Sequence, residues 1–579
     1  WANGKADLID SSWVHCEYDI SAVADRQPEV FVRWCMGPTD SSGAYAGWNI
    51  DDVCLVGDLL DPLFISPTDV FFSVGPEGGP FSPVCKSYTL TNNGDSALNW
   101  NAEGTQPWLD VTPSAGTLAP DSNITAYICI SDANSLSEDI YTGTASFTNT
   151  NTGFSREIEA ILSVGDSLIV PLQYPTVQLA IDAAVEGDTI IVMDGTYREG
   201  INFKGKAITL KSANGPDRCG LGLSTVRFSH GEDNQSVLEG FTLSVGEHGI
   251  YCENSSPVII NCVVKNMENY GGSGAGMYNK NSNPILVDCS FINNLASVGG
   301  GMYNSNSNPM LFNCIFKGNS VDELDFGRGA GMYNNSSNPY LFNCIFTGNR
   351  AYGGGAGAYA GYGGGMYNNL SNPVLINCTF SKNNAGGEGT GGGLENYNSK
   401  PTLINCILWG NSDAGGTREA AQIYTRGAGS PTINYSCVQN WSGKHGGTGN
   451  IGDDPLFVTR PSGDYYLSQT AAGQAVNSPC VDTGIDLAVN WGLDVFTTRT
   501  DHVGDTGIVD MGYHYTIPPP SPADIDEDGD VDFADYAILA DQWQQPPGTP
   551  SADIAPPGGN GIVDIYDLDL LVEHWLWGK

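Results

Sequence analysis

Short apolar runs recur through the middle of the chain, and each run lies between a proline and a cysteine, as in Pro-Val-Leu-Ile-Asn-Cys at 373–378. The cysteine follows the proline by five residues in six copies and by six residues in the seventh. The repeat length varies between 25 and 34 residues. The prolines are Pro257, Pro284, Pro309, Pro339, Pro373, Pro401 and Pro431, and the cysteines are Cys262, Cys289, Cys314, Cys344, Cys378, Cys406 and Cys437.

A second phrase, Gly-Met-Tyr-Asn, separates the copies at 276–279, 301–304, 331–334 and 365–368, and it becomes Gly-Leu-Glu-Asn at 393–396. Each copy also carries glycines and β-branched or aromatic runs, without the apolar spacing of a helix. A period of this length indicates a solenoid, whereas a propeller blade needs about 40 residues or more. We therefore predict a mainly β chain built around a parallel β-helix with two or three short strands per coil.

Stacked coils lie about 4.8 Å apart, so every repeated residue predicts a column of equivalent side chains. An asparagine column can pass amide hydrogen bonds along the stack, and an apolar column would fill the interior. The predicted asparagine column is Asn279, Asn304, Asn334, Asn368 and Asn396, and the predicted apolar column is Phe291, Phe316, Phe346, Phe380 and Leu408.

The seven cysteines predict a third column, which could hold free thiols, disulfides or a metal. The coil spacing is wider than the separation of about 3.8 Å between Cβ atoms that a disulfide needs. No histidine accompanies the cysteines, as a metal site would favour. We expect free, buried thiols that act as small apolar side chains.

Two β-sandwich modules are predicted before the solenoid. Residues 1–60 contain short strands near 12–19, 29–36 and 48–56, and 47–53 (Gly-Trp-Asn-Ile-Asp-Asp-Val) resembles the last strands of secreted jelly-roll modules related to MAM and carbohydrate-binding domains. Because such modules need about eight strands, we interpret 1–60 as the C-terminal part of a larger sandwich. The missing strands would come from residues outside this sequence or from another chain.

Residues 61–165 have the alternation of an immunoglobulin-like sandwich, with strands expected near 87–91, 124–131 and 143–148. The phrases beginning at Tyr88 and Trp108 resemble bacterial BACON-type modules, which implies a spacer or a glycan-binding role. Cys85 and Cys129 fall on expected strands and could bridge the two sheets.

The β-helix domain is predicted over 166–515. Apolar residues at helical spacing within 175–186 indicate a short helix that would plug the open end of the solenoid. The following run, Gly-Asp-Thr-Ile-Ile-Val-Met-Asp-Gly-Thr-Tyr at 187–197, resembles the start of pectin-lyase-like right-handed β-helices. The closing phrases Asp-Pro-Leu-Phe at 454–457 and Ser-Pro-Cys-Val-Asp at 478–482 extend this resemblance over roughly 168–515, and it is specific for the fold rather than for an activity.

A proline-rich linker at 516–522 leads to a C-terminal module at 523–579 that contains two acidic loops. Side-chain oxygens at loop positions 1, 3, 5 and 12, a backbone carbonyl at position 7 and a glycine at position 6 for the sharp turn form the oxygen cage that Ca²⁺ prefers. The first loop supplies Asp524, Asp526, Asp528, Gly529, Asp530, Asp532 and Asp535. The second supplies Asp553, Asn560, Gly561, Asp564 and Asp567 around an inserted Pro-Pro-Gly-Gly.

The pair of loops resembles a type I dockerin, in which aspartate replaces the usual glutamate at position 12. The resemblance implies Ca²⁺ binding and a cohesin-like partner, with Tyr536, Leu539, Tyr566 and Leu571 as candidates for either the partner face or the core. The longer second loop departs from the family pattern.

Charge and composition limit the classes of binding partner that the chain can have. The chain of 579 residues carries 65 acidic and 24 basic side chains, a net charge of −41, which argues against nucleic acid and anionic membranes. No apolar run approaches the length of a membrane span. The chain starts without methionine, which suggests a processed or incomplete N-terminus, and we expect a secreted or cell-surface protein. The fifteen cysteines leave at least one unpaired or bridging chains.

Catalytic residues are not evident in the repeats, because lysines and arginines do not keep one register and the acids Glu323, Asp325, Glu388 and Glu395 lie in inserts or at a decayed motif position. A last cluster joins His502 and His514 with Asp501, Asp505 and Asp510, and its phrase matches the closing coil of the family, which favours capping over catalysis.

Two function classes remain. We favour an extracellular structural or adhesive protein that is anchored, or assembled into filaments, through its terminal modules. The alternative is a dockerin-tethered polysaccharide lyase or glycoside hydrolase, whose catalytic residues would come from separate coils.

Overall fold

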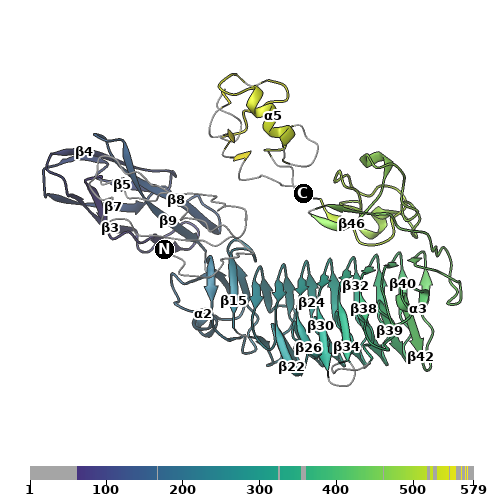
Figure 1. The fold of residues 1–579 in the computed structure, drawn as a ribbon. Coiled ribbons are helices and arrows are strands. Elements are labelled where there is room, and N and C mark those ends of the chain that lie inside the picture. The colour runs from purple at the N-terminus through teal and green to yellow at the C-terminus, as the bar shows by residue number, and fades with distance from the viewer. Residues whose placement is uncertain are drawn as a thin grey trace, which may run out of the picture.

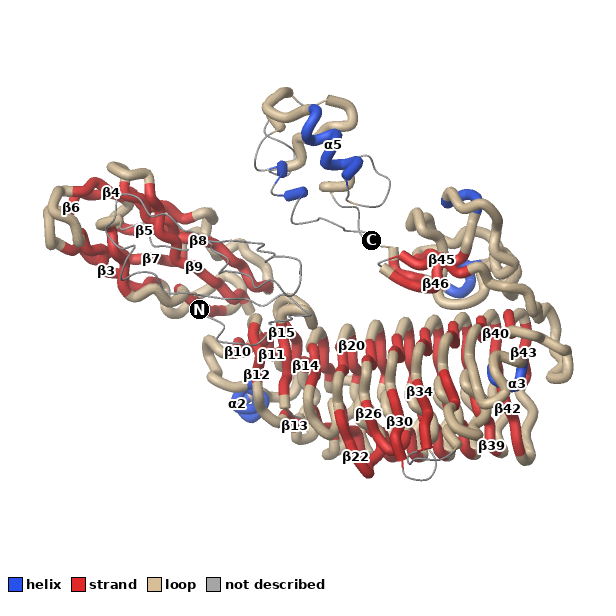
Figure 2. Tube along the Cα trace, in the orientation of Figure 1, coloured by secondary structure: helices blue, strands red, loops and turns tan. Residues whose placement is uncertain are grey.

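The computed structural model describes residues 61–165, 167–223, 225–323, 327–353, 360–460, 462–517, 522–525, 531, 533–546, 548–555, 562–563, 567–568 and 570–571. The jelly-roll piece predicted at 1–60 lies outside the described residues. Strands dominate, and the few short helices lie at the two ends of the coil stack, in the segment that follows it and in the C-terminal module (Figure 2).

The first module consists of two sheets that share one core. The core includes Trp100, Tyr88, Phe71 and Phe147, which are all buried. One sheet has the order β1 (Leu63–Ser66), β3 (Cys85–Asn92), β7 (Asn123–Ile130) and β5 (Leu109–Thr112). The other has the order β2 (Phe71–Gly75), β9 (Phe154–Val164), β8 (Asp139–Asn149), β4 (Leu98–Gly104) and β6 (Ala115–Leu118). Strands β3, β7 and β8 confirm the three strands expected in this module.

Cys85 and Cys129 form a disulfide, but it does not bridge the two sheets as the sequence suggested. The two residues lie directly opposite each other on β3 and β7, which are neighbours in the same sheet, with their Cα atoms 4.1 Å apart. Both side chains therefore point to the same face of one sheet, and the bond ties two adjacent strands.

The central module is a stack of coils with three strands in most coils and a fourth in five of them (Figure 1). Sheet I contains β10 (Leu168–Val170), β11 (Thr189–Val192), β14 (Thr209–Ser212), β17 (Val237–Glu239), β20 (Val258–Ile260), β24 (Ile285–Val287), β28 (Met310–Phe312), β32 (Tyr340–Phe342), β36 (Val374–Ile376), β40 (Thr402–Ile404) and β43 (Thr432–Asn434). Sheet II contains β12 (Gly195–Tyr197), β15 (Cys219–Gly222), β18 (Thr242–Ser244), β21 (Val263–Lys265), β25 (Ser290–Ile292), β29 (Ile315–Lys317), β33 (Ile345–Thr347), β37 (Thr379–Ser381), β41 (Ile407–Trp409) and β44 (Cys437–Val438).

Sheet III contains β13 (Ile201–Asn202), β16 (Val226–Phe228), β19 (Ile250–Glu253), β23 (Met277–Lys280), β27 (Met302–Ser305), β31 (Met332–Asn335), β35 (Met366–Asn369), β39 (Leu394–Tyr397) and β42 (Ile423–Arg426). Sheet IV contains β22 (Glu268–Ser273), β26 (Leu295–Val298), β30 (Ser320–Glu323), β34 (Arg350–Gly353) and β38 (Asn384–Ala385). Neighbouring strands in all four sheets are parallel, as a β-helix requires, and they keep one register except between β22 and β26 of sheet IV, where the register shifts after Asn269.

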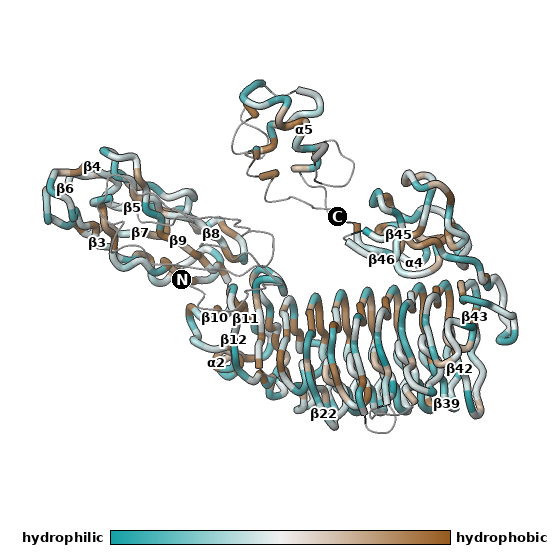
Figure 3. The backbone as a smooth tube through the Cα atoms, in the orientation of Figure 1, coloured by the Kyte–Doolittle hydropathy of each residue, from teal (hydrophilic) through white to brown (hydrophobic). Residues whose placement is uncertain are grey.

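The predicted interior columns are present, and apolar stretches recur coil after coil (Figure 3). Phe291, Phe316, Phe346 and Phe380 stack face to face with ring centroids 4.9, 4.5 and 4.5 Å apart. The amide groups of Asn279, Asn304, Asn334, Asn368 and Asn396 form a buried ladder in which each Nδ2 donates to the next Oδ1 at 2.9 Å.

A second buried ladder was not predicted. It runs through Asn294, Asn319, Asn349, Asn383 and Asn411, with amide hydrogen bonds of 2.8 to 3.0 Å, and ends on Gln422. Each of these asparagines follows a column cysteine by five residues, so the spacing was visible in the sequence. Two sets of buried amides therefore tie successive coils together in addition to the backbone.

The repeat cysteines are free and buried, as predicted, but the seventh does not belong to the column. Cys437 lies opposite Ile407, at an outward-facing position of sheet II. Ser436 takes the interior place, because it follows Pro431 by the same five residues that separate proline and cysteine in the other copies.

The first coil is closed by helix α2 (Val177–Ala183), which confirms the helix expected there. Thr176 caps it by accepting a hydrogen bond from the backbone N–H of Leu179 at 3.2 Å. Val177, Ala180 and Ile181 are buried in the same core as the coils. At the other end, α3 (Glu419–Gln422) precedes the last strand of sheet III.

Residues 454–517, the closing segment, fold back against the side of the coils. The segment contains β45 (Phe457–Arg460), β46 (Gly463–Leu467), the 3₁₀ helix η1 (Thr470–Ala472), α4 (Ala488–Trp491), β47 (Phe496–Thr497) and β48 (Tyr515–Thr516). Tyr465 and Tyr513 pack on Ile345 of sheet II, and Trp491 packs on Phe342 of sheet I. Beyond it, α5 (Phe533–Asp541) belongs to the C-terminal module.

We predict that Asn334→Ala destabilises the β-helix strongly. The substitution leaves the Nδ2 of Asn304 and the Oδ1 of Asn368 without partners in the interior, at a cost of about 1–3 kcal/mol for each group. Urea unfolding followed by circular dichroism measures the loss. Asn335→Ala, on the same strand but facing outward, is the control and should cost less than about 1 kcal/mol. Equal losses in the two variants would contradict the importance of the ladder.

Candidate functional site

A column of tyrosines runs along the outer face of sheet III. Tyr251, Tyr278, Tyr303, Tyr333 and Tyr367 occupy equivalent positions on five successive strands. Neighbouring ring centroids lie 5.1 to 5.5 Å apart. The first four rings are half-buried and Tyr367 is buried. Four of these tyrosines belong to the repeated phrase Gly-Met-Tyr-Asn, in which only the asparagine was expected to have a structural role.

The column beside the tyrosines is polar. Two residues further along the same strands stand Glu253, Lys280, Ser305, Asn335 and Asn369. Lys280 pairs with Glu253 at 2.8 Å, and Asn369 donates to Asn335 at 2.7 Å. The first two ring pairs are stacked and the next two are edge-to-face. The outer face of sheet III therefore combines a column of aromatic rings with a parallel row of charged, hydroxyl and amide groups.

An ion pair between a buried glutamate and a partly exposed arginine ends the tyrosine column. Glu395 takes the place of tyrosine on β39, is fully buried, and accepts a hydrogen bond from Thr390 Oγ1 at 2.7 Å. Its Oε1 lies 3.0 Å from Nε of Arg426. Burial, opposed by Thr390 and Arg426, raises the pKa of Glu395 to about 7. The structure thus brings together two residues that the sequence did not connect. Glu395 stands where the repeated phrase decays, and Arg426 is one of the basic residues that keep no constant register.

Aromatic rings enclose this pair. The Arg426 guanidinium lies 4.7 Å from the Tyr362 ring centroid and 5.1 Å from that of Tyr397, and it donates to the Tyr367 hydroxyl at 3.2 Å. Of the other acids considered, Glu388 is exposed in a neighbouring turn, and Asp325 lies outside the described residues.

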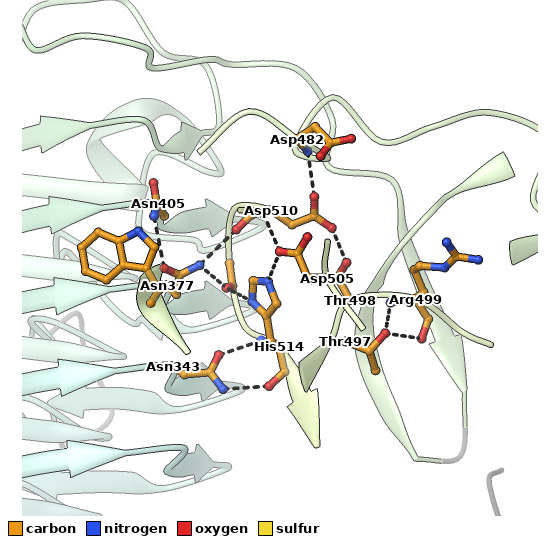
Figure 4. A network of polar contacts seen from close by, with 12 residues as sticks. Asn343, Asn377, Asn405, Asp482, Thr497, Thr498, Arg499, Asp505, Asp510 and His514 are labelled. Carbon is orange, nitrogen blue, oxygen red and sulfur yellow. Dashed lines mark hydrogen bonds and ion pairs between the residues drawn. The ribbon is translucent and has the colours of Figure 1, made fainter. Parts of the chain in front are cut away.

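A second polar cluster holds the closing segment (Figure 4). His514 Nε2 lies 2.8 Å from Asp505 Oδ2, and Asp510 accepts hydrogen bonds from the backbone N–H of Asp482 at 2.7 Å and from the Thr498 hydroxyl. Burial and the neighbouring Asp505 raise the pKa of Asp510 to about 6. His514 is fully buried, so this cluster has no open face for a substrate.

Three asparagines of the coils form hydrogen bonds with the backbone of the closing segment (Figure 4). Asn343 accepts from the His514 N–H and donates to its C=O, both at 2.7 Å. Asn377 donates to the Asp510 C=O at 3.0 Å, and Asn405 accepts from the N–H of Ile485 at 2.8 Å. The cluster therefore attaches the segment to the coils.

Not every residue of the predicted histidine–aspartate cluster belongs to this network. Asp501 instead forms an ion pair with Arg499. His502 packs its ring edge-on against Tyr466, with ring centroids 6.2 Å apart.

Four of the ten predicted Ca²⁺ ligands lie among the described residues. Asp535 and Asp567, at the ends of the two loops, are fully buried. Asp535 Oδ1 accepts from the N–H of Ile525 at 2.6 Å, and Asp567 Oδ1 accepts from the N–H of Ile554 at 2.6 Å. The remaining described ligands, Asp524 and Asp553, directly precede these two isoleucines. Asp526, Asp528, Asp530, Asp532, Asn560 and Asp564 lie outside the described residues.

The C-terminal module has a small core of its own. Leu539 and Leu571 are buried in it, together with Val531 and Val563 from the two loops, whereas Tyr536 is exposed on α5. Tyr566, the fourth candidate for a partner face, is outside the described residues. Within the described part of the chain, no three His, Cys, Asp or Glu side chains are grouped to hold a metal, and no helix is long and apolar enough to cross a membrane.

We predict that Glu395→Gln changes the pH dependence of stability. A carboxyl whose pKa is raised from 4.5 to about 7 by folding binds more protons in the folded state between these values, so its contribution to stability falls as pH rises through this window. The variant should therefore gain on the order of 1–3 kcal/mol relative to the native chain between pH 5 and pH 8. Urea unfolding at both pH values measures this, with Glu388→Gln as the exposed control. A constant difference between Glu395→Gln and the native chain would contradict the shifted pKa.

Comparison with known proteins agrees with two parts of the fold. The family model described as a right handed beta helix region matches residues 229–365, and the model described as a viral BACON domain matches residues 83–154. No curated protein matches the chain.

Among solved structures, the YadV chaperone is 16% identical over 18% of this chain and 53% of its own, with a TM-score of 0.15. The ASH/PapD-like domain 7 of human CEP192 is 10% identical over 20% of this chain and 96% of its own, with a TM-score of 0.16. The Pseudomonas aeruginosa CupB2 chaperone is 12% identical over 17% of this chain and 55% of its own, with a TM-score of 0.14. The match thus spans about half the length of the two chaperones. The family models and the parallel sheets together show a chain that contains a right-handed parallel β-helix preceded by a BACON-like module.

Proposed function

We propose that this chain is an extracellular structural or adhesive protein whose rigid β-helix binds a polysaccharide along sheet III and whose C-terminal module couples it to a partner in the presence of Ca²⁺. The observation that carries the binding role is the tyrosine column. Four half-buried rings, Tyr251, Tyr278, Tyr303 and Tyr333, follow one another on successive parallel strands, so a long polymer with a repeating unit meets an aromatic ring at each of these coils.

The chemistry of the face suits sugar rings. One side of a pyranose ring carries C–H groups that pack on an aromatic ring, while its hydroxyls need hydrogen-bonding partners. Tyr278, Tyr303 and Tyr333 offer half-buried rings, and Asn335 and Asn369 offer amides in the adjacent column. The tyrosine rings are held by the sheet before binding, so little side-chain entropy is lost.

Charge favours a neutral polysaccharide. The net charge of −41 repels polyanions. Two cations of this face are paired with acids, Lys280 with Glu253 and Arg426 with Glu395. Arg227, opposite Tyr251 on the preceding strand, lies 4.9 Å from the centroid of the Tyr251 ring. A neutral polymer leaves both ion pairs intact.

The C-terminal module supports a Ca²⁺-dependent coupling. Both loops are closed by the same hydrogen bond. The last aspartate of each loop accepts from the backbone N–H of the residue that follows the first aspartate, at Asp535–Ile525 and at Asp567–Ile554. The insertion in the second loop therefore leaves its closure intact. The donors predicted from the sequence all carry oxygen, which fits Ca²⁺, and the ion would offset the negative charge of the two loops. These donors are Asp524, Asp526, Asp528, Asp530, Asp532 and Asp535 in the first loop and Asp553, Asn560, Asp564 and Asp567 in the second. A cohesin-like partner rests on the dockerin resemblance.

The second candidate function is that of a polysaccharide lyase or hydrolase. The ion pair between the buried Glu395 and Arg426 is the observation that supports this function. A carboxyl with its pKa near 7 is suited to donate or accept a proton. Glu395 has no exposed surface, however, and its oxygen is engaged by Arg426. Substrate would have to displace Tyr362 or Thr390 to reach it, which is why binding is the primary proposal.

We predict that Tyr278→Ala and Tyr303→Ala each weaken binding of a neutral polysaccharide about five- to thirtyfold, since loss of a stacked ring costs roughly 1–2 kcal/mol. Affinity electrophoresis in gels that contain xylan, β-glucan or galactomannan measures the change. Tyr270→Ala is the matched control, because Tyr270 is 71% exposed but lies on sheet IV outside the column. Absence of retardation in every gel, or an equal effect of Tyr270→Ala, would contradict the site.

The same samples distinguish the two candidates. Incubation with these polymers and with pectin and alginate, followed by uronate absorbance and reducing-end assays, should show no turnover. Product formation that is lost in Glu395→Gln would replace the binding proposal with catalysis.

We predict that Ca²⁺ raises the unfolding temperature of the C-terminal module and that EDTA lowers it. Fluorescence of Trp543, which packs on the core of the module, reports the transition. Asp535→Asn should remove most of the response, because it removes a buried ligand charge. Asp541→Asn, an exposed acid on the same helix, should keep it. An unchanged transition with Ca²⁺ and with EDTA would contradict the coupling.

A further inference from the structure

The last repeat departs from the others by one residue, and the structure gives the departure a physical meaning. Each of the six column cysteines lies against the backbone carbonyl two residues before it, with Sγ–O distances of 3.3 to 3.4 Å. Ser436 makes the same contact with the carbonyl of Asn434, at 2.9 Å. Ser436 is therefore the seventh member of the interior column, and Cys437 is an additional cysteine.

Cys437 faces the closing segment. Its neighbour across sheet II is Ile407, an outward-facing residue that the closing segment covers. Cys480 of that segment lies in the same buried cluster, with Ile407, Leu467 and Met511 around the two cysteines. Neither cysteine has exposed surface, and both thiols are free in this structure.

We propose that Cys437 and Cys480 form a disulfide that locks the closing segment onto the last coil when the protein matures under oxidising conditions. The column cysteines differ, because they repeat at the coil spacing and stay reduced. The inference goes beyond the proposed function and holds whether or not the chain binds a polysaccharide.

The reaction is thiol–disulfide exchange. The thiolate of one cysteine attacks a small-molecule disulfide such as oxidised glutathione, and one glutathione leaves as a thiol. The second cysteine, after losing its proton, displaces the second glutathione and closes the protein disulfide. Two protein thiols are thereby oxidised while one glutathione disulfide is reduced to two thiols.

The surroundings determine when the bond can form. The hydrogen bond with Cys480, followed by burial, raises the pKa of the Cys437 thiol, which makes the thiolate scarce in the closed state. Cys437 also contacts the Asp453 carbonyl at 3.2 Å. Exchange should therefore take place while the closing segment is still open during folding, and the finished bond should resist external reductant until the segment opens.

The proposed bond adds to contacts that already hold the segment. Asn343, Asn377 and Asn405 bind its backbone further along the coils. Cys437–Cys480 would fix the segment at the end of the stack, where the last strand of sheet II pairs with β41 on one side and with only the single bridge residue Ile451 on the other.

The test refolds the full chain with reduced and oxidised glutathione, alkylates free thiols in denaturant and maps the peptides by mass spectrometry. The expected result is a linked pair of peptides containing Cys437 and Cys480, with Cys262, Cys289, Cys314, Cys344, Cys378 and Cys406 alkylated. The Cys85–Cys129 bond is the internal positive control. Complete alkylation of Cys437 and Cys480, or linkage of either to a column cysteine, would overturn the proposal.

A variant pair gives an independent readout. Limited proteolysis within 454–517 should become several-fold faster in Cys480→Ser than in the native chain, and reductant in mild urea should speed cleavage of the native chain but not of the variant. Cys406→Ser, a column cysteine, is the matched control and should keep the reductant response. An equal response of the native chain and Cys480→Ser to reductant would also contradict the bond.

Discussion

The in-register stacking of identical side chains is the constraint on which the rest of the structure depends. Parallel strands repeat at one spacing, so an amide, a ring or a thiol placed once per coil meets its own copy above and below. The Asn279–Asn396 and Asn294–Asn411 ladders use this in the interior, where a single unpaired amide would cost more than any one ladder bond contributes. A coil that leaves the register loses several such partners at once, and this makes the stack stiff.

The same constraint produces the outer surface. Because side chains alternate across a strand, the residue next to each ladder asparagine must face outward, and in four successive repeats that residue is a tyrosine. Interior regularity and a regular outer face are therefore two consequences of one phrase, Gly-Met-Tyr-Asn. Glu395 interrupts the face at the point where the repeat decays, and Arg426 comes from the next strand of sheet III to pair with it.

Much of this could be predicted from the sequence, because the information is periodic. The coils, the Asn279 ladder, the phenylalanine stack and the plugging helix follow from spacing alone. The asparagines of the Asn294 ladder have an equally constant spacing from the cysteines, but the residues next to them vary between copies, so no repeated phrase marks them. Ser436 was overlooked because a cysteine stands beside it, and the position in the register rather than the residue type decides which side chain points inward.

Contacts between distant segments could not be predicted, since no period connects them. Asn343 meets the backbone of His514, and Glu395 meets Arg426 on another coil, through packing of the whole chain. The Cys85–Cys129 bond also depends on a contact between distant segments. The sequence predicts a strand around each cysteine, but it does not show whether the two strands are neighbours in one sheet or face each other across the core.

Native-state hydrogen exchange across residues 250–440 tests the central claim most directly. If the ladders couple the coils, backbone amides in sheets I, II and III should exchange together, at the rate set by unfolding of the whole stack. Exchange that proceeds coil by coil, with separate opening free energies for individual repeats, would contradict the account.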